Sequence, residues 1–364
     1  MLIKEITSAI EEYAPVSFQE SYDNSGLIIG NPEQETAGVL LAIDVTEDVI
    51  QEAINNQIKL IISHHPLIFN GLKKISGINY LDKAIILAIK NDIAIYAAHT
   101  NMDNVSGGVN NKICDLLGIQ NPQILLPVKH KLQKLVTFVP SDHADIVRQA
   151  LFDAGAGNIG NYDNCSFNVE GKGTFRGNDY TNPFVGEKGK LHVEKEVRIE
   201  TAFPVHFQSK VLKALIQSHP YEEVAYDIYN LENDYSFAGA GMIGDLSEPV
   251  TEITFLTRVK EIFKTGCIRH TRLLNKKISK IAVCGGSGSF LVSEAIRKHA
   301  DVFITADMKY HQFFDADNRI LVMDIGHFES EQFTKNIFYD ILVKKFPKFA
   351  VRFSEINTNP INYF

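Results

Sequence analysis

The chain has 364 residues, of which 45% are hydrophobic and 22% are charged, as in a globular protein with a packed core. A chain of this length exceeds most single cores, so the sequence predicts two domains. Its formal net charge is −8 and no basic tract runs along it, which argues against nucleic-acid binding, because phosphate neutralisation needs clustered lysine and arginine.

The N-terminal third alternates strand and helix signals. It begins with an amphipathic helix that lacks the apolar core and cleavage site of a signal peptide. Strands are expected at residues 26–30, 38–45, 58–65 and 93–100, and helices at 46–57, 79–92 and 108–118. Thr46 is the expected N-cap of the first of these helices, and Gly118 is the expected end of the last. Strands alternating with helices predict a mostly parallel sheet.

The last third repeats this pattern, and the middle differs from it. Strands are expected at residues 277–286, 301–307 and 319–327, and helices at 289–300 and 330–346. The middle reads as strands and two helices in the order of a split βαβ module. The predicted fold class is therefore α/β. Mixed, mostly parallel sheets flanked by helices form a discontinuous outer domain (1–128 and 237–364), which holds an inserted α+β, ferredoxin-like domain (129–236).

Polar side chains follow several predicted strands at the point where each strand ends. In an α/β sheet, ligands bind beyond the carboxyl ends of the strands. We therefore expect a site at one edge of a single sheet, drawn from His64, His65, His99, Asp103, Asp307, His311, His327 and Glu331.

His327 and Glu331 stand at i and i+4, so one helix face brings them close enough to bind one ion. An exposed helix contact explains the same spacing. His64 and His65 are adjacent at a strand end, and Pro66 biases His65 toward an extended backbone. Adjacent imidazoles there can diverge to bind two different ions, or they can simply be satisfied histidines at a sheet edge.

Three imidazoles and two carboxylates, from His64, His65, Asp103, His327 and Glu331, suit two divalent ions. Nitrogen-rich ligation favours zinc, iron or manganese over magnesium or calcium. Asp103 alternatively shapes a turn, and His99 is a ligand, a partner of a ligand or a general acid/base.

The segment "CGGSGSF" (284–290) joins a predicted strand to a predicted helix. Its backbone N–H groups, at Gly285, Gly286 and Ser287, are candidates for holding an anion, with Asp307 in the same pocket. A tight strand-to-helix turn is the alternative. The four cysteines are widely spaced and form no C-x-x-C pair, which indicates a reduced, cytoplasmic protein without a thiolate site. No segment approaches the roughly 18 to 20 apolar residues of a membrane span.

The motifs "SYDNSGLIIG", "SHHPLIF", "AAHTNMD", "GAGMIGDL", "CGGSGSF", "ITADMKYHQFFDA" and "DIGHFESE" occur in this order. Their order resembles the dinuclear-metal family of GTP cyclohydrolase 1 type 2 homologues, the NIF-three-like family, and the insertion resembles the PII-like module of its longer bacterial members. The resemblance implies two ions per subunit, with His64 and His65 on different ions and Glu331 bridging. It implies that His99, Asp307 and His311 line the same pocket, and that the chains form a toroidal homohexamer.

The sequence is consistent with two functions. The first is a metal-dependent hydrolase in which metal-activated water attacks a nucleotide or another phosphorylated small molecule, with His99 or His311 moving the proton. The resemblance suggests GTP as the substrate. The second is a non-enzymatic metal-handling or regulatory ring, which the PII-like insertion favours. A ring that threads DNA is disfavoured by the acidic net charge.

Overall fold

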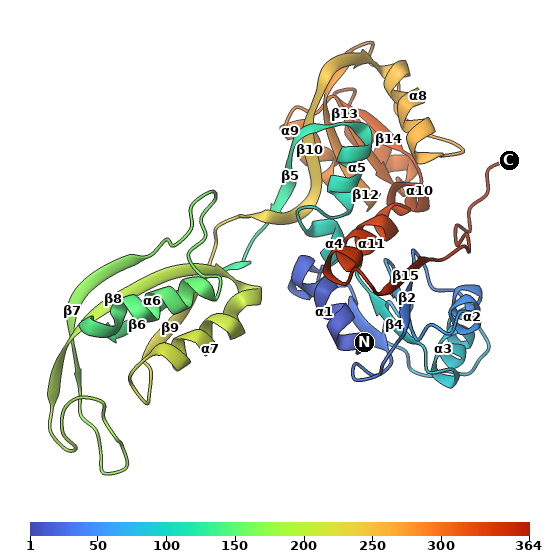
Figure 1. The fold of residues 1–364 in the computed structure, drawn as a ribbon. Coiled ribbons are helices and arrows are strands. Elements are labelled where there is room, and N and C mark those ends of the chain that lie inside the picture. The colour runs from blue at the N-terminus through green and yellow to red at the C-terminus, as the bar shows by residue number, and fades with distance from the viewer. The chain divides into compact units, whose positions relative to one another are not determined.

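The structure, a computed structural model, describes residues 1–364. The chain divides into two compact units (Figure 1), one formed by Met1–Pro127 with Ser236–Phe364 and the other by Val128–Tyr235. None of the helices has the length and apolar character needed to cross a membrane.

The first sheet of the larger unit has five strands in the order β1-β4-β3-β2-β15. The last four run parallel, and only β1 is antiparallel to its neighbour. The three central strands are buried along their whole length, as parallel strands covered by helices on both faces are. The bounds are β1 (Gly26–Ile29), β2 (Gly38–Ala42), β3 (Leu60–Ser63), β4 (Ala94–Ala97) and β15 (Ala350–Phe353).

The second sheet has six strands in the order β11-β14-β13-β12-β10-β5. Its centre is parallel, since β12, β13 and β14 run the same way, whereas β10 and β11 are antiparallel to their neighbours. The bounds are β5 (Gln120–Val128), β10 (Tyr235–Thr251), β11 (Arg269–His270), β12 (Lys277–Ser287), β13 (Val302–Ala306) and β14 (Leu321–Asp324).

Helices separate and cover the two sheets. One hydrophobic cluster joins the facing surfaces of both sheets through α1, α5, α8 and α11, while α2 and α3 cover the outer face of the first sheet and α9 that of the second. The bounds are α1 (Ile3–Tyr13), α2 (Glu47–Asn55), α3 (Tyr80–Lys90), α4 (Thr100–Asn104), α5 (Val109–Leu117), α8 (Glu252–Phe263), α9 (Val292–Arg297), α10 (His327–Glu331) and α11 (Thr334–Lys345). Short 3-10 turns include η1 (Val16–Phe18), η4 (Ser289–Leu291) and η5 (Tyr310–Ala316).

The expected helix ends at Thr46 and Gly118 are confirmed. The Thr46 hydroxyl accepts a hydrogen bond from the Val49 N–H at 3.3 Å, which satisfies one free donor of α2. Gly118 ends α5 with φ 68°, a left-handed conformation that glycine adopts without a side-chain penalty.

The expectation of a single sheet is wrong. The histidine pair follows β3 of the first sheet, whereas His327 follows β14 of the second. The alternation of strands and helices is the same in both halves, so it could not show that the chain starts a new sheet. The expected helix at 330–346 is also interrupted at Gln332 and Phe333, between α10 and α11. The Gln332 side chain donates to the Phe263 carbonyl at 2.9 Å, a tertiary contact that periodicity does not reveal.

The smaller unit is a four-stranded antiparallel sheet in the order β7-β8-β6-β9. Its β-α-β-β-α-β sequence of elements is that of a ferredoxin-like module. Its two helices pack on one face and enclose a separate core. The bounds are β6 (Leu132–Pro140), α6 (Ala144–Asp153), β7 (Phe167–Phe175), β8 (His192–Pro204), α7 (Gln208–Ser218) and β9 (Tyr226–Leu231), with 3-10 turns η2 (Ser141–His143) and η3 (Val205–Phe207).

Candidate metal centre

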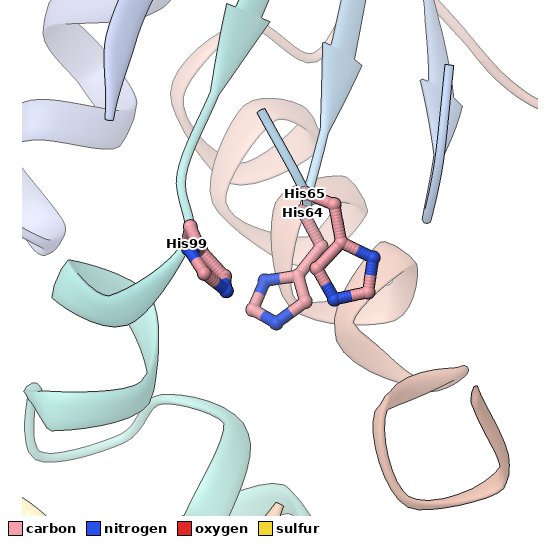
Figure 2. A group of neighbouring side chains, drawn as sticks. All are labelled: His64, His65 and His99. Carbon is pink, nitrogen blue, oxygen red and sulfur yellow. The ribbon is translucent and has the colours of Figure 1, made fainter. Parts of the chain in front are cut away.

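Three histidines meet beyond the ends of two neighbouring strands of the first sheet. His64 and His65 follow β3, and His99 follows β4, which runs parallel to β3 (Figure 2). The ring centroids lie 4.9 Å apart for the adjacent pair, and 5.3 and 5.4 Å from each of these to His99. The common direction of the two strands therefore brings the three imidazoles together.

The second sheet supplies the other half of the site. His327 and Glu331 are the first and last residues of α10, which follows β14. The His327 Nε2 lies 3.1 Å from the Glu331 Oε2, as the i,i+4 spacing predicts. The His327 ring also lies 5.0 Å from the His65 ring, so both sheets contribute to one cluster.

One group of possible ligand atoms consists of His65 Nε2, His327 Nε2 and Glu331 Oε2. The nitrogens are 3.1 Å apart, and the carboxylate oxygen lies 3.0 Å from the first and 3.1 Å from the second. Ligand atoms bound about 2.0 to 2.1 Å from a tetrahedral zinc lie roughly 3.3 Å from one another. The three atoms are therefore spaced as ligands of one cation.

A second group consists of His64 Nε2, Asp103 Oδ1 and the same Glu331 Oε2. The nitrogen lies 3.6 Å from the aspartate oxygen and 3.5 Å from the glutamate oxygen, which is too long for a hydrogen bond. Both His64 Nε2 and Asp103 Oδ1 are buried atoms without a hydrogen-bond partner. Buried polar atoms are nearly always paired, so this pair fits a cation between them.

A third group joins His64, His65 and His99. It overlaps both other groups, and it makes His99 a possible ligand as well as a neighbour of the site. The chain therefore has His, Asp and Glu groups able to hold a metal ion, and Glu331 belongs to two of the three groups.

Each imidazole is held by its Nδ1, which leaves Nε2 facing the cluster. His65 donates to Asp44 at 2.7 Å, His99 to Asp23 at 2.7 Å and His327 to Asp307 at 2.6 Å. His64 donates to a backbone carbonyl, that of Ala98, at 2.9 Å. Since a carboxylate or carbonyl oxygen only accepts, the Nδ1 atoms carry protons, and each ring in its neutral form presents an Nε2 lone pair. This is the usual arrangement behind metal-ligating histidines.

The cluster concentrates charge, which shifts the pKa values of two imidazoles upward. Burial alone would lower the pKa of His65, but hydrogen bonds to Asp44 and Glu331 raise it to about 9. For His327, burial is again outweighed, by the Glu331 charge and the Asp307 hydrogen bond, and the pKa rises to about 11. Without a cation, protons bound to His65 and His327 balance the negative charge of the cluster.

The pKa values of the two carboxylates of the cluster shift in opposite directions. Burial and the neighbouring charge of Glu331 raise the pKa of Asp103 to about 8. For Glu331, burial acts in the same direction but is outweighed by His64 and His327, and the pKa falls well below its ordinary value. Glu331 is therefore ionised, and it is the anionic centre of the cluster.

A cavity of about 360 Å³ opens over the cluster. Its lining includes His65, His99, Asp103, His327 and Glu331, and the aromatic side chains of Tyr22, Phe69 and Phe290 also border it. All three aromatic side chains are exposed, and the Tyr22 and Phe69 rings lie 6.2 Å apart. A small molecule in this cavity would touch both the polar cluster and aromatic surface.

The glycine segment is built differently from the expected anion cradle. The backbone N–H groups of Gly285, Gly286 and Gly288 donate to the side chains of Asn110, Ser330 and Thr305, each at 2.9 Å. Two of the three expected donors, those of Gly285 and Gly286, are therefore already satisfied inside the protein. Ser287, the third, is exposed and borders the cavity.

Position 286 requires a glycine because the Glu331 side chain packs directly against its backbone. Its φ is +61°, and a Cβ placed on it would lie 2.2 Å from the Glu331 Oε1. Gly286 lies inside β12, whose register shifts between Val283 and Ser287, so the expected turn is a bulge within the strand. The glycine makes room for the central carboxylate.

Asp307 and His311, which were expected to line the pocket, are not among the residues that line the cavity. Asp307 is behind His327 as the acceptor of its Nδ1 proton and is not among the residues that line the cavity. His311 is exposed on η5, where its ring contacts Tyr310 and Phe314, and it joins none of the three groups. The structure therefore brings six of the eight strand-end residues to the cluster.

Two contributing residues, Asp23 and Asp44, escaped the sequence analysis. Asp44 follows β2, the neighbour of β3, so the rule applied to the other strand ends also covers it. Asp23 follows no strand. Its carboxylate bonds the His99 ring, the Thr100 N–H and the Ser25 hydroxyl, and only tertiary contacts reveal that role. The His99 and Thr100 hydrogen bonds outweigh burial and hold the pKa of Asp23 far below its ordinary value.

The fold and the site together define a class: an α/β protein with two helix-covered sheets whose strand ends gather imidazoles and carboxylates able to hold a metal ion. Comparison with known proteins identifies the family. The pattern of the Duf34/NIF3 (NGG1p interacting factor 3) family matches residues 1–360, and the chain belongs to that family.

Relatives and solved structures agree with this assignment. A protein of Halalkalibacterium halodurans, named GTP cyclohydrolase 1 type 2 homolog, is 43% identical over 324 residues, covering 88% of this chain and 87% of the relative. A Bacillus subtilis protein of the same name is 38% identical over 365 residues, covering 99% and 98%. The crystal structure of a Bacillus cereus protein related to NIF3 is 41% identical, with a TM-score of 0.86 over 100% of this chain and 99% of that one. These findings confirm the family resemblance and the α/β fold class.

Proposed function

We propose that this chain holds two divalent cations, zinc first and iron or manganese as alternatives, as the centre of a metal-dependent hydrolase. His65 and His327 would hold one cation, His64 and Asp103 the other, and Glu331 would bridge them. The observation that carries the proposal is the buried pair of His64 Nε2 and Asp103 Oδ1, which have no hydrogen-bond partner and face the ionised Glu331.

When bound, such cations supply Lewis acidity, which lowers the pKa of a water and polarises a phosphoryl or carbonyl oxygen. The chain's own residues would hold the cations and transfer the proton. His99 lies beside the cluster with its Nδ1 held by Asp23, so its Nε2 is placed to take up or release a proton in the cavity. His311, which the sequence also suggested for this step, is exposed, does not line this cavity and belongs to none of the three groups.

The proposed substrate class is a nucleotide or another phosphorylated small molecule. Support comes from the aromatic border of the cavity, where a flat ring could stack, and from the relatives named GTP cyclohydrolase 1 type 2 homolog. The amides of Gly285 and Gly286 are already used, so a phosphate group would be held by the cluster and by Ser287, which borders the cavity.

The test combines metal analysis with turnover. Freshly purified protein should contain close to two equivalents of transition metal per chain by inductively coupled plasma mass spectrometry. The metal-loaded protein should then hydrolyse at least one substrate in a panel of phosphoesters and purine nucleotides that includes GTP. In the Glu331→Gln variant, which removes the shared anionic ligand, we expect both the metal and the turnover to be lost.

Glu329→Gln is the matched control, because Glu329 is also buried on α10 but bonds Asn359 and belongs to none of the three groups. It should keep its metal and its activity. Metal-free protein under all loading conditions would contradict the metal proposal. Full metal occupancy without turnover on the whole panel would instead support the alternative, a metal-handling or regulatory protein.

We further propose, from the family resemblance, that the chains assemble into a ring-shaped homohexamer and that the smaller unit is a PII-like module. Size-exclusion chromatography with light scattering measures the first directly. A monomer or dimer at micromolar concentration would contradict it.

A further inference from the structure

The smaller unit contains its own cavity, of about 600 Å³, which belongs to no part of the metal centre. It lies along β7 and β8 and beneath the loop that connects them. Its floor includes Gly171 and Gly173, which stand two apart on β7 and so point to the same face. Two successive positions without side chains leave a hollow on the sheet.

A buried carboxylate lies at this hollow. Glu196 on β8 is only 8% exposed, and it lines the cavity. A Cβ on Gly173 would lie 2.0 Å from its Oε2, so the glycine is what gives the carboxylate its position. The Tyr221 hydroxyl donates to its Oε1 at 2.9 Å, and this is the only hydrogen bond to the Glu196 side chain in the structure. A carboxylate has room for several donors, so this one can accept more.

Four aromatic residues border the same space, Phe138, Phe175, Phe184 and Tyr221. The Tyr221 ring lies 5.8 Å from the Phe175 ring and 6.4 Å from the Phe184 ring, and all three residues line the cavity. Burial and the adjacent Glu196 raise the pKa of Tyr221, so its hydroxyl stays protonated and remains a donor. The faces of aromatic rings attract cations, and quaternary ammonium groups are commonly bound by such rings.

The arrangement is fixed from several sides. His219 bonds the Phe138 carbonyl through Nε2 and accepts the Tyr221 N–H on Nδ1, both at 3.0 Å, which anchors Tyr221 to β6. The loop over the cavity is tied down where the Asn182 N–H donates to Glu222 at 2.7 Å. The cavity is therefore preformed.

Three cationic residues of this chain also line the cavity, but none of them forms an ion pair with Glu196. Arg198 pairs with Glu200 at 2.9 Å. Lys172 alternates with the two floor glycines on β7, so it points to the opposite face of the sheet, and Arg176 is exposed just past the strand end. The negative charge of Glu196 is therefore left for a ligand.

We infer that this cavity binds a small organic cation, with an ammonium group against Glu196 and the rings of Phe175, Phe184 and Tyr221 around it. The inference is independent of the proposed hydrolase, since all of these residues lie in the smaller unit.

The test is isothermal titration calorimetry on the full-length protein with choline, tetramethylammonium and spermidine. The neutral isostere of choline, 3,3-dimethylbutan-1-ol, serves as the uncharged control. We expect saturable binding of at least one cation, at least about tenfold tighter than the isostere, because the ammonium charge is recognised. No binding of any cation at millimolar concentration, or equal binding of choline and its isostere, would overturn the inference.

Variants locate the site. Glu196→Gln keeps the shape and removes the charge, and Phe184→Ala removes one ring; each should weaken cation binding by about tenfold or more. Glu232→Gln removes an exposed carboxylate of the same unit that does not line the cavity, and it should bind as the wild type does. Unchanged binding in Glu196→Gln, in protein with a wild-type thermal transition, would place the cation elsewhere and reject the site.

Discussion

At the scale of single residues, the candidate metal centre depends on which nitrogen of each imidazole is free. Four histidines have their Nδ1 bound to an oxygen, three of them to carboxylates. Such partners orient the ring and make the remaining nitrogen more basic, so they are part of a metal site although they touch no metal. The contribution of Asp44 can therefore be measured separately from that of the ligands.

Asp44→Ala should weaken zinc affinity by about 10- to 100-fold, because the His65 ring loses the acceptor that fixes its tautomer and orientation. Competition with a fluorescent zinc chelator measures this affinity. Asp48→Ala, an exposed carboxylate four residues further on, is the control and should bind zinc normally. If both variants bind as the wild type does, Asp44 has no role in the site.

The raised pKa values predict opposite effects of pH on the metal-free and the zinc-bound protein. The pKa of His65 rises from 6.5 to about 9 and that of His327 to about 11. The folded protein thus holds these protons more tightly than the unfolded chain does. The stability they contribute is complete below pH 6.5 and is lost as pH rises through about 9 to 11.

Urea unfolding of the metal-free protein should therefore show lower stability at pH 9 than at pH 7. The stabilisation by added zinc should grow from pH 6 to pH 8, because zinc displaces protons from the same nitrogens. Zinc stabilisation that shrinks over that interval would show that these histidines do not bind it.

At the scale of elements, the site depends on how α10 packs against β12. The Ser330 hydroxyl accepts the Gly286 N–H, and the adjacent Glu331 carboxylate fills the space where a Cβ of Gly286 would lie. The glycines of this segment thus set the distance between a strand and a helix. Gly286 makes room for the Glu331 carboxylate, whereas the sequence motif suggested a cradle for an anion.

Gly286→Ala should lower the free energy of unfolding by about 1 to 3 kcal/mol, because alanine is strained at φ +61° and its Cβ would displace Glu331. Zinc affinity should also fall, because Glu331 is displaced. Thermal and chemical unfolding, with zinc titration of the folded protein, measure both effects. Gly71→Ala is the control, since no atom lies within 4 Å of a Cβ built there, and it should be neutral.

At the scale of the whole molecule, each sheet of the larger unit includes a strand from the other half of the chain. β15, from the end of the chain, pairs with β2 in the first sheet, and β5, from the N-terminal half, joins the second sheet beside β10. Neither half of the sequence completes its own sheet. This interlocking holds the two sheets, and thus the two halves of the candidate metal centre, together.

All of the proposed ligands lie in the larger unit, so a chain without residues 128–235 should still bind metal. The two cut ends are close, since a Cβ on Gly239 would lie 2.7 Å from the Pro127 Cα, and a short glycine-serine linker can join them. We expect the shortened protein to fold and to bind as much zinc per chain as the full-length protein. A folded but metal-free product would show that the smaller unit is needed to form the centre.

The sequence by itself determined most of the local elements and most of the residues that meet in the candidate site. Periodicity located most helices and strands, and the rule that ligands gather at strand ends selected His64, His65, His99, Asp103, His327 and Glu331. These inferences succeed because they depend on side-chain spacing along one segment. The same rule also selected His311, which points into solvent, because a strand end specifies an edge but no direction.

Tertiary structure alone decided that the strands form two sheets, that Asp23 reaches His99 across 76 residues of sequence, and that Gly286 makes room for Glu331. It also produced the cavity around Glu196, whose rings come from segments that the sequence shows only as loops and a glycine-rich strand. The physical reason is the same in each case. These features depend on contacts between distant segments, and the pattern of residues within a segment carries no information about which distant segment will pack against it.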